Sequence, residues 1–398
     1  MLPQVGGGRV QVQLSEKAPV VLDIGSRFTK LGFAGDFAPR FILPTRQRCG
    51  ENGVDQLNTR DFIHWLYYNH FLVMPKDRRV VVVESVLTPT EQRYELARIL
   101  FEHFNVPSVL FVPSHLLCTM PFRAQSALVV DCGHKETMVL PISEGVPMLN
   151  CWQCSPVGGR LLHDHCKELL MKHAHVRTGT ERVPIAEHPE VLHAIQHDSV
   201  VEDIFVKCCF VTKLDRGRLY QTYDWADPNL PAAPPDVQYP IVDKQVNLIV
   251  PGAVRESVCE LLFATTHTDD RKNITQLILD SILHCPIDLR RPLLERLLIV
   301  GGVALIPGFM SRLKAELLDL LASDEGYKHK LPMRTVKFMM LQQANMQNYV
   351  AWLGGSLFGA TEILAYRSLS RDDWLKHKHI PDWMDKIDQI EIEETKKG

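Results

Sequence analysis

The residues best suited to chemistry lie where two apolar runs end in an aspartate, one further residue and a glycine, at residues 20–25 and 128–133. A glycine turn lets backbone N–H groups approach an anion closely, and an adjacent carboxylate can hold a hydrated metal ion. Two such turns facing each other would bind a polyphosphate from both sides, and Lys30 would add a positive charge to the first turn. Each turn alone is more often an ordinary sharp β-turn, which favours the same residue types.

A third junction strengthens the phosphate interpretation. The apolar residues 297–300 lead into Gly301 and Gly302, and a helix is expected from residue 309. A helix N-terminus behind two glycines is well suited to face a nucleotide.

The elements that must position these turns are predicted by hydrophobic pattern. Short apolar runs bounded by polar or turn residues are typical of buried parallel strands. The clearest helix begins at residues 88–91, where Thr-Pro-Thr-Glu predicts a capping box with proline at the first helical position. Strands alternating with helices predict an α/β architecture, and the repeated strand–turn–strand pattern predicts two related lobes. The predicted strands are residues 19–22, 80–83, 109–112, 128–130 and 297–300.

Composition narrows the class of protein. The chain has 398 residues, a formal net charge of −3, 45% hydrophobic residues and 23% charged residues, which is typical of a globular protein of two to three domains. The near-neutral balance argues against a nucleic-acid partner, and no apolar run reaches the roughly 18 residues that would cross a bilayer. The ten cysteines are too sparse for a disulfide framework, so a reducing cytosolic or nuclear location is expected.

The candidate turns belong to a longer pattern that resembles actin and the actin-related proteins. That resemblance covers roughly residues 19–365, with its motifs in the family's order, and implies an actin-like fold: two α/β lobes around a nucleotide cleft. It also implies ATP or ADP with Mg²⁺ as cofactor. The matching stretches are residues 23–40 (first phosphate loop), 131–133 (second phosphate loop), 158–160, 280–291, 300–309 (adenosine segment) and 352–357 (C-terminal signature).

By this resemblance, two aspartates, a serine, a lysine and five glycines would bind the nucleotide. Asp23 and Asp131 would also hold Mg²⁺ through water. The implied nucleotide-binding residues are Asp23, Gly25, Ser26, Lys30, Asp131, Gly133, Gly159, Gly301 and Gly302.

The resemblance also implies four subdomains. Their expected ranges are 17–44, 61–121 and 350–398 for subdomain 1, 45–60 for a vestigial subdomain 2, 122–157 and 263–349 for subdomain 3, and 158–262 for subdomain 4.

Hydrolysis is expected to be absent or very slow, so we predict no catalytic residues and no enzyme. The glutamine that orients water in actin aligns with Ser114, and the assisting histidine aligns with Met138. A serine hydroxyl is too short for the first role, and a thioether cannot relay a proton. Loss of a positioned base commonly lowers the rate on the order of 10²–10⁴-fold. The neighbouring His115 is a weak candidate replacement.

Other departures change the phosphate and nucleoside contacts. Arg27 replaces a loop glycine, and its side chain either swings out or lends a cation to the phosphates. His134 replaces an acid of the second loop, which is expected to weaken or rearrange Mg²⁺ binding. Phe205 and Val206 replace a charged pair, so they could sandwich a base but would not hydrogen-bond a ribose.

The largest departure is a deletion, because only 24 residues separate Arg40 from Trp65 where actin places its small second subdomain. A subunit without that subdomain could dock on a filament through its opposite face and offer little to a newcomer, and so would end the filament. Residues 113–117, 130–133 and 149–152 most resemble the pointed-end subunits of dynactin (the actin-related protein ten class, called eleven in vertebrates).

The resemblance to that class implies specific partners. They are the dynactin filament of actin-related protein one and actin, together with the other pointed-end proteins. The implied setting is the cytoplasmic cytoskeleton, with a supporting role in dynein-driven transport and no membrane insertion.

Alternatives from other classes are an active ATPase or sugar-kinase-like phosphotransferase on the same fold, and an actin-related subunit of a nuclear chromatin remodeller.

Residues 151–166 contain cysteines and histidines that invite a zinc or redox interpretation, but incidental thiols are favoured. The proline-rich residues 227–240 are expected to form an exposed loop, and the end of the tail is expected to fray. Trp374, Ile380, Trp383 and Met384 are expected to dock on the chain's own first lobe rather than on a partner.

Overall fold

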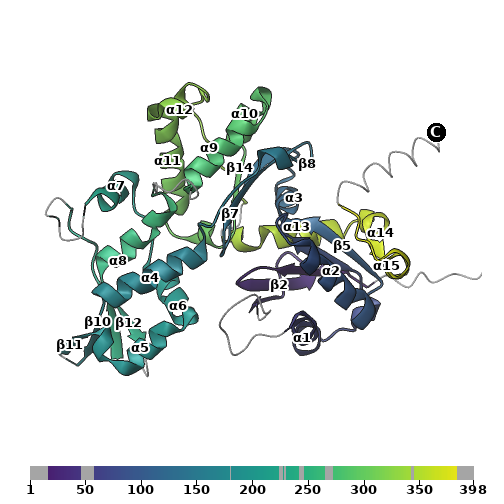
Figure 1. Cartoon of the computed structure of the whole chain (residues 1–398), viewed down its shortest axis with the longest axis horizontal. Helices are drawn as coiled ribbons and strands as arrows, with labels where there is room; N and C mark the ends of the chain where they lie inside the picture. Colours follow the sequence, from purple (N-terminus) through teal and green to yellow (C-terminus); the bar gives the residue numbers. More distant parts are fainter. Residues whose placement is uncertain are drawn as a thin grey trace, which may run out of the picture.

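The computed structural model describes residues 17–45, 58–179, 181–223, 227, 230–241, 246–264, 272–341 and 345–382. Figure 1 shows two groups of elements. The purple and blue elements from β1 to α3 and the yellow C-terminal helices form the first lobe, and the blue-to-green elements from β6 to α12 form the second. No helix in these ranges is both long and apolar enough to cross a membrane.

In the first lobe, the described strands form a six-stranded sheet in the order β15-β5-β4-β1-β2-β3. The central strands β1, β4 and β5 are parallel, and β2, β3 and β15 pair antiparallel. Their near-continuous apolar sequences suit strands that are covered on both faces. The strands are β1 (Val20–Ile24), β2 (Phe28–Phe33), β3 (Phe41–Pro44), β4 (Val80–Glu84), β5 (Ser108–Pro113) and β15 (Leu369–Ser370).

Helices from both ends of the chain cover this sheet, and α13 packs against β1, β4 and α3. The helices α1 and α2 continue as π-helical turns over Leu66–Phe71 and Ile99–His103. The helices of this lobe are α1 (Thr59–Trp65), α2 (Thr90–Arg98), α3 (Ser114–Thr119), α13 (Val350–Gly359), α14 (Ile363–Arg367) and α15 (Arg371–His377).

In the second lobe, the described strands form a five-stranded and a four-stranded sheet. The first has the order β14-β6-β7-β8 with β9 also on β7, and the second is antiparallel in the order β11-β10-β13-β12. The strands are β6 (Ala127–Cys132), β7 (Thr137–Ser143), β8 (Val146–Pro147), β9 (Gln153–Ser155), β10 (His175–Thr178), β11 (Glu181–Pro184), β12 (Val237–Ile241), β13 (Val246–Val250) and β14 (Leu297–Val300).

The helices of the second lobe surround one large apolar core, which extends from β6 to α11. They are α4 (Gly159–His173), α5 (Pro189–Gln196), α6 (Asp198–Cys208), α7 (Leu214–Thr222), α8 (Gly252–Ser257), α9 (Ile274–His284), α10 (Ile287–Leu294), α11 (Phe309–Ser323) and α12 (Glu325–Lys328).

The predicted internal repetition is confirmed. Strand β1 pairs antiparallel with β2 and parallel with β4, and β6 pairs antiparallel with β7 and parallel with β14. Each lobe therefore contains an Asp-x-Gly turn at the end of a strand that lies between a hairpin partner and a parallel neighbour. All five predicted strands are present.

Three local expectations have different outcomes. The capping box at residues 88–91 is wrong, because Pro89 is the N-cap of α2 and no side chain caps the helix. The described part of the proline-rich segment is exposed over most of its length, but its end forms β12, an edge strand that tolerates Pro240 because an edge N–H need not pair. Trp374 and Ile380 are buried in the core of the first lobe, as expected.

Some sequence predictions lie outside the described residues. These are most of the vestigial subdomain 2, Pro228 within the proline-rich segment, and the tail from residue 383. The four subdomain ranges remain predictions.

Candidate functional site

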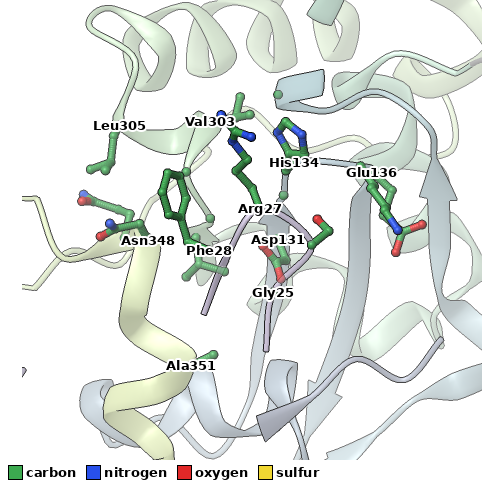
Figure 2. Close-up of a pocket in the computed structure, with 18 of the residues that line it drawn as sticks. Gly25, Arg27, Phe28, Asp131, His134, Glu136, Val303, Leu305, Asn348 and Ala351 are labelled. Atoms are coloured by element: carbon green, nitrogen blue, oxygen red, sulfur yellow. The ribbon is translucent and has the colours of Figure 1, made fainter. Parts of the chain in front are cut away.

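A cavity of about 440 Å³ lies between the two lobes, and all nine predicted nucleotide-binding residues line it. Asp23 lies near the end of β1, Gly25 and Ser26 form the turn after it, and Lys30 lies on β2. In the second lobe Asp131 lies near the end of β6, and Gly133 follows that strand. Gly159 begins α4, while Gly301 and Gly302 follow β14. Ends of strands and the N-terminus of α4 thus converge from both lobes (Figure 2). The helix predicted behind Gly301 and Gly302 begins only at Phe309, after a 3-10 turn over Val303–Leu305.

The glycine turns of the two lobes have the same hydrogen bond. The Gly25 N–H donates to the Phe28 carbonyl at 3.1 Å, and the Gly133 N–H donates to the Glu136 carbonyl at 3.0 Å. A Cβ at Gly25 would lie 2.7 Å from that Phe28 oxygen, so a larger residue would displace the turn. These turns therefore need glycine for their own shape.

The third glycine junction is still more constrained. Gly301 has φ of +94°, and a Cβ there would lie 2.3 Å from the Cys132 carbonyl oxygen and 2.7 Å from Asp131 Oδ1. The next residue, Gly302, has no described heavy atom within 4 Å of where its Cβ would be. Gly301 thus brings β14 against the second turn, and Gly302 leaves its backbone open to the cavity.

Lys30 is paired with Asp23 and is also influenced electrostatically by Asp131. Its Nζ donates to Asp23 Oδ2 at 3.0 Å, and the two residues face each other in the β1–β2 register. Burial opposes the charge on Lys30, but Asp23 and Asp131 together outweigh it and raise the pKa of the lysine. The ammonium therefore stays charged, and Asp23 is already paired in the structure.

Arg27 joins the two lobes across the cavity. Its Nε and Nη2 donate to Oε2 of Glu202 on α6 at 2.9 and 2.5 Å, and the side chains are 28% and 19% exposed. Figure 2 shows the Arg27 side chain rising from the Gly25 turn between Phe28 and His134. The sequence left open whether this side chain swings out or serves the phosphates, and here it bonds a carboxylate of the other lobe.

His134 occupies the place where the actin pattern has an acid. Burial, together with the nearby His163 and Arg27, lowers the pKa of His134 to about 4. The His134 and His163 rings lie 5.6 Å apart, and His163 makes an edge contact with Phe205 at 5.2 Å. At neutral pH the second loop therefore presents an uncharged imidazole where a carboxylate is expected.

The residues at the aligned hydrolytic positions also line the cavity. Met138 faces Asp131 in the β6–β7 register, and Ser114 begins α3. His115 lines the same cavity, with Nδ1 3.3 Å from Ser114 Oγ, and burial lowers the pKa of His115. None of the three supplies a side-chain amide that could orient water.

The far end of the cavity suits a base. Phe205, Leu305 and Ile306 give it apolar walls. Gln347 and Asn348, just before α13, also line it, and their buried oxygens Oε1 and Oδ1 have no hydrogen-bond partner among the described residues. Buried unpaired acceptors are costly, so a ligand with amino donors would satisfy them.

Glu202, Gln347 and Asn348 line the cavity but were not predicted as site residues. Their only sequence signal is proximity to a motif: Gln347 and Asn348 precede the signature at 352–357, and Glu202 precedes Phe205. Nothing in their residue type marked them.

The residues present fit an adenine nucleotide better than they fit Mg²⁺. The open Gly302 backbone, the apolar walls and the unpaired amide oxygens suit a nucleotide. The two metal candidates, Asp23 and Asp131, are accompanied by Lys30 and a neutral histidine, whereas Mg²⁺ prefers oxygen ligands. Among the described residues, no three histidine, cysteine or acidic side chains form a metal-binding group.

The cysteines and histidines of residues 151–166 do not converge in the described structure. Cys151 and Cys166 are buried in the core of the second lobe, and Cys151 donates to a backbone carbonyl of α9. His163 faces the cleft instead.

This combination of two strand–turn–strand lobes and a glycine-lined cleft is that of the actin family. The family pattern of actin matches residues 54–380, so the chain belongs to that family and has its fold. The chain is similar to actin-related protein 10 of Dictyostelium discoideum, with 24% identity over 93% of this chain and 90% of the relative. It is also similar to putative actin-29 of the same organism, with 23% identity over 90% of this chain and 94% of the relative.

Proposed function

We propose that this chain is a structural actin-related subunit that caps the pointed end of the dynactin mini-filament and helps hold the pointed-end complex. Its partners would be actin-related protein one, actin and the other pointed-end proteins, and its setting the cytoplasmic cytoskeleton. In that setting it would support dynein-driven transport along microtubules. The similarity to an actin-related protein 10 supports this class.

One observation carries the capping argument. Strand β3 ends at Pro44 and α1 begins at Thr59, so only residues 45–58 separate the edge strand of the first lobe from its first helix. An actin-like subunit receives its neighbour at the pointed end through the subdomain inserted there. With that insertion reduced to residues 45–58, the subunit keeps its opposite face for docking and offers no site for further addition.

The test is an elongation assay on short filaments of actin-related protein one and actin. Adding this chain should stop growth at the pointed end and leave the barbed end free to grow. Continued pointed-end addition at saturating chain would refute the capping proposal. Purification of the tagged chain from cytosol at low salt should recover the same subunits, whereas recovery of chromatin remodellers would favour the nuclear alternative.

We also propose that the cavity holds ATP or ADP, with weak Mg²⁺ binding and little or no hydrolysis. The nine lining residues and the unpaired oxygens of Gln347 and Asn348 support nucleotide binding. Ser114 and Met138 support slow hydrolysis, because neither orients or activates water. ATP turnover comparable to that of actin would favour the ATPase alternative and point to His115 as the replacement base.

A further inference from the structure

We call the part of the cavity beside the Gly25 and Gly133 turns the phosphate end, and there each cationic side chain of the first turn and β2 is paired with a carboxylate. Lys30 is paired with Asp23 at 3.0 Å, and Arg27 is paired with Glu202. Both cations stand on β2 or on the turn before it, beside the glycines that would cradle a phosphate. The two cations that would meet a polyanion are thus each paired with a carboxylate before it binds.

The oxygen ligands for a divalent cation are correspondingly few. Mg²⁺ demands near-octahedral oxygen coordination and is usually held by carboxylates, phosphate oxygens and water. To ligate through Asp23 it would have to compete with the Lys30 ammonium for the same carboxylate. At the second turn His134 offers a nitrogen ligand, which Mg²⁺ disfavours.

Glu136, the next acid after His134, does not make up the deficit. Its carboxylate accepts a hydrogen bond from the Cys154 thiol of β9. Asp131 is therefore the carboxylate of the two turns that makes no side-chain hydrogen bond or ion pair among the described residues, so Mg²⁺ would have one free carboxylate and would otherwise depend on phosphate oxygens and water.

A guanidinium is well suited to replace the metal ion. It is always charged, and its planar fork binds two phosphate oxygens at once. Arg27 directly follows Gly25 and Ser26 in the first phosphate turn, so a rotation of its side chain away from Glu202 would bring it over that turn.

We infer that the cleft binds a nucleoside polyphosphate without a divalent cation, with Arg27 and Lys30 neutralising the phosphates in place of the metal. This inference rests on the proposed nucleotide binding and goes beyond it by naming the metal-free nucleotide as the ligand. Glu202 competes with the phosphates for Arg27, so the ligand must break the ion pair between the lobes.

The test compares the dissociation constants of ATP and ADP, measured by calorimetry on the nucleotide-free full chain, in excess EDTA and in Mg²⁺. For the natural sequence, the dissociation constant of each nucleotide in EDTA should agree with its value in Mg²⁺ within about threefold, because no metal ligand is lost. Arg27→Gly, which restores the residue of the actin pattern, should weaken binding in EDTA by about tenfold or more, the loss expected for one charge-assisted contact. Glu202→Gln should tighten it, because Arg27 is released.

Two further variants sharpen the test. His134→Asp restores an oxygen ligand and should make binding depend on Mg²⁺. Lys207→Ala is the matched control: Lys207 is also on α6 in an ion pair, with Asp203 at 2.6 Å, but its side chain is 61% exposed and away from the cavity. Lys207→Ala should leave the nucleotide dissociation constants in EDTA and in Mg²⁺ unchanged.

The outcomes separate cleanly. Binding in EDTA that depends on Arg27 supports the inference. Binding that is lost in EDTA and restored by Mg²⁺ overturns it while leaving nucleotide binding intact. No binding in either condition overturns both the inference and the nucleotide proposal, and the capping proposal is still judged separately by filament growth.

Discussion

The ion pair between Arg27 and Glu202 should hold the nucleotide-free cleft closed. It joins the turn after β1 to α6, so the lobes cannot separate at this end of the cavity without breaking it. Removing either side chain should therefore raise the population of open molecules. The variants Arg27→Ala and Glu202→Ala test this, with Lys207→Ala as the control on the same helix.

The size of the effect follows from the burial of the pair. With side chains 28% and 19% exposed and two N–H donors on one carboxylate oxygen, the pair lies between an exposed and a buried ion pair. We assign it about 1–2 kcal/mol, above the usual value for surface pairs and close to that for hydrogen bonds to charged groups. Since about 1.4 kcal/mol is a factor of ten, the open population should rise by roughly tenfold.

One buried thiol reports this opening, and a second serves as its control. Cys209 lines the cavity and is 4% exposed, whereas Cys118 is 1% exposed and does not line it. Burial raises the pKa of the Cys118 thiol, and contact with Cys166 together with burial raises that of Cys209, so neither reacts readily in the closed protein. Alkylation followed by peptide mass spectrometry should show Cys209 reacting about tenfold faster in Arg27→Ala, with Cys118 unchanged.

A double-mutant cycle identifies the cause. If the pair acts as a unit, the variant lacking both side chains should react about as fast as either single variant. Equal Cys209 rates in Arg27→Ala and the natural sequence would refute the reasoning, because the pair would then contribute nothing to closure. Equal acceleration of Cys118 would show general destabilisation instead.

Three further predictions concern stability and are read by urea or thermal unfolding. Gly301→Ala should lower the free energy of unfolding by more than about 2 kcal/mol, because φ is +94° and the new Cβ would lie 2.3 Å from the Cys132 carbonyl oxygen. An unchanged unfolding midpoint would contradict that geometry. Trp374→Ala should cost about 3 kcal/mol or more, because the ring is 3% exposed and stacks on Phe101 with centroids 5.6 Å apart; a loss below about 1 kcal/mol would mean that the C-terminal helix is not docked. Burial outweighs the ion pair that Glu84 makes with Arg93 at 3.2 Å and raises the pKa of Glu84 from 4.5 to about 7. The folded state therefore disfavours the charge, and the free energy of unfolding falls as pH rises from about 4.5 to about 7. Glu84→Gln should therefore stabilise by on the order of 2 kcal/mol at pH 8 and by little near pH 4.5, and the opposite trend would contradict the assigned cause.

Much of the fold and of the cavity lining could be predicted because the signals are local. Apolar runs gave the strands β1, β4, β5, β6 and β14, and a glycine directly after a strand marks a place where backbone must come close to something else. Seven of the nine predicted site residues belong to such junctions, while Lys30 lies within β2 and Gly159 begins α4. In the second lobe Asp131, Gly133, Gly301 and Gly302 converge because the parallel neighbours β6 and β14 end at the same edge of their sheet.

The charge pairing of the site could not be predicted in the same way. Arg27 and Glu202 are 175 positions apart, and no periodicity or motif connects them. The unpaired oxygens of Gln347 and Asn348 are likewise a property of the folded surroundings, because an amide in a sequence gives no sign of whether it will find a partner. The capping box predicted at residues 88–91 was wrong for a local reason: Pro89 itself is the N-cap residue of α2, and it has no side-chain acceptor.

The cleft and the start of the segment between β3 and α1 are connected through hydrogen bonds of Thr45. Its N–H donates to the Arg27 carbonyl at 2.9 Å, its hydroxyl donates to the Gly25 carbonyl at 2.7 Å, and the Thr29 hydroxyl lies 2.9 Å from it. The chain that leaves β3 is therefore fastened to the first phosphate turn before it enters residues 46–57. A movement of Arg27 between Glu202 and a phosphate would act on the same backbone that anchors this segment. An arginine in the phosphate turn and a short segment between β3 and α1 are two departures from the actin pattern, and they thus meet at one set of hydrogen bonds.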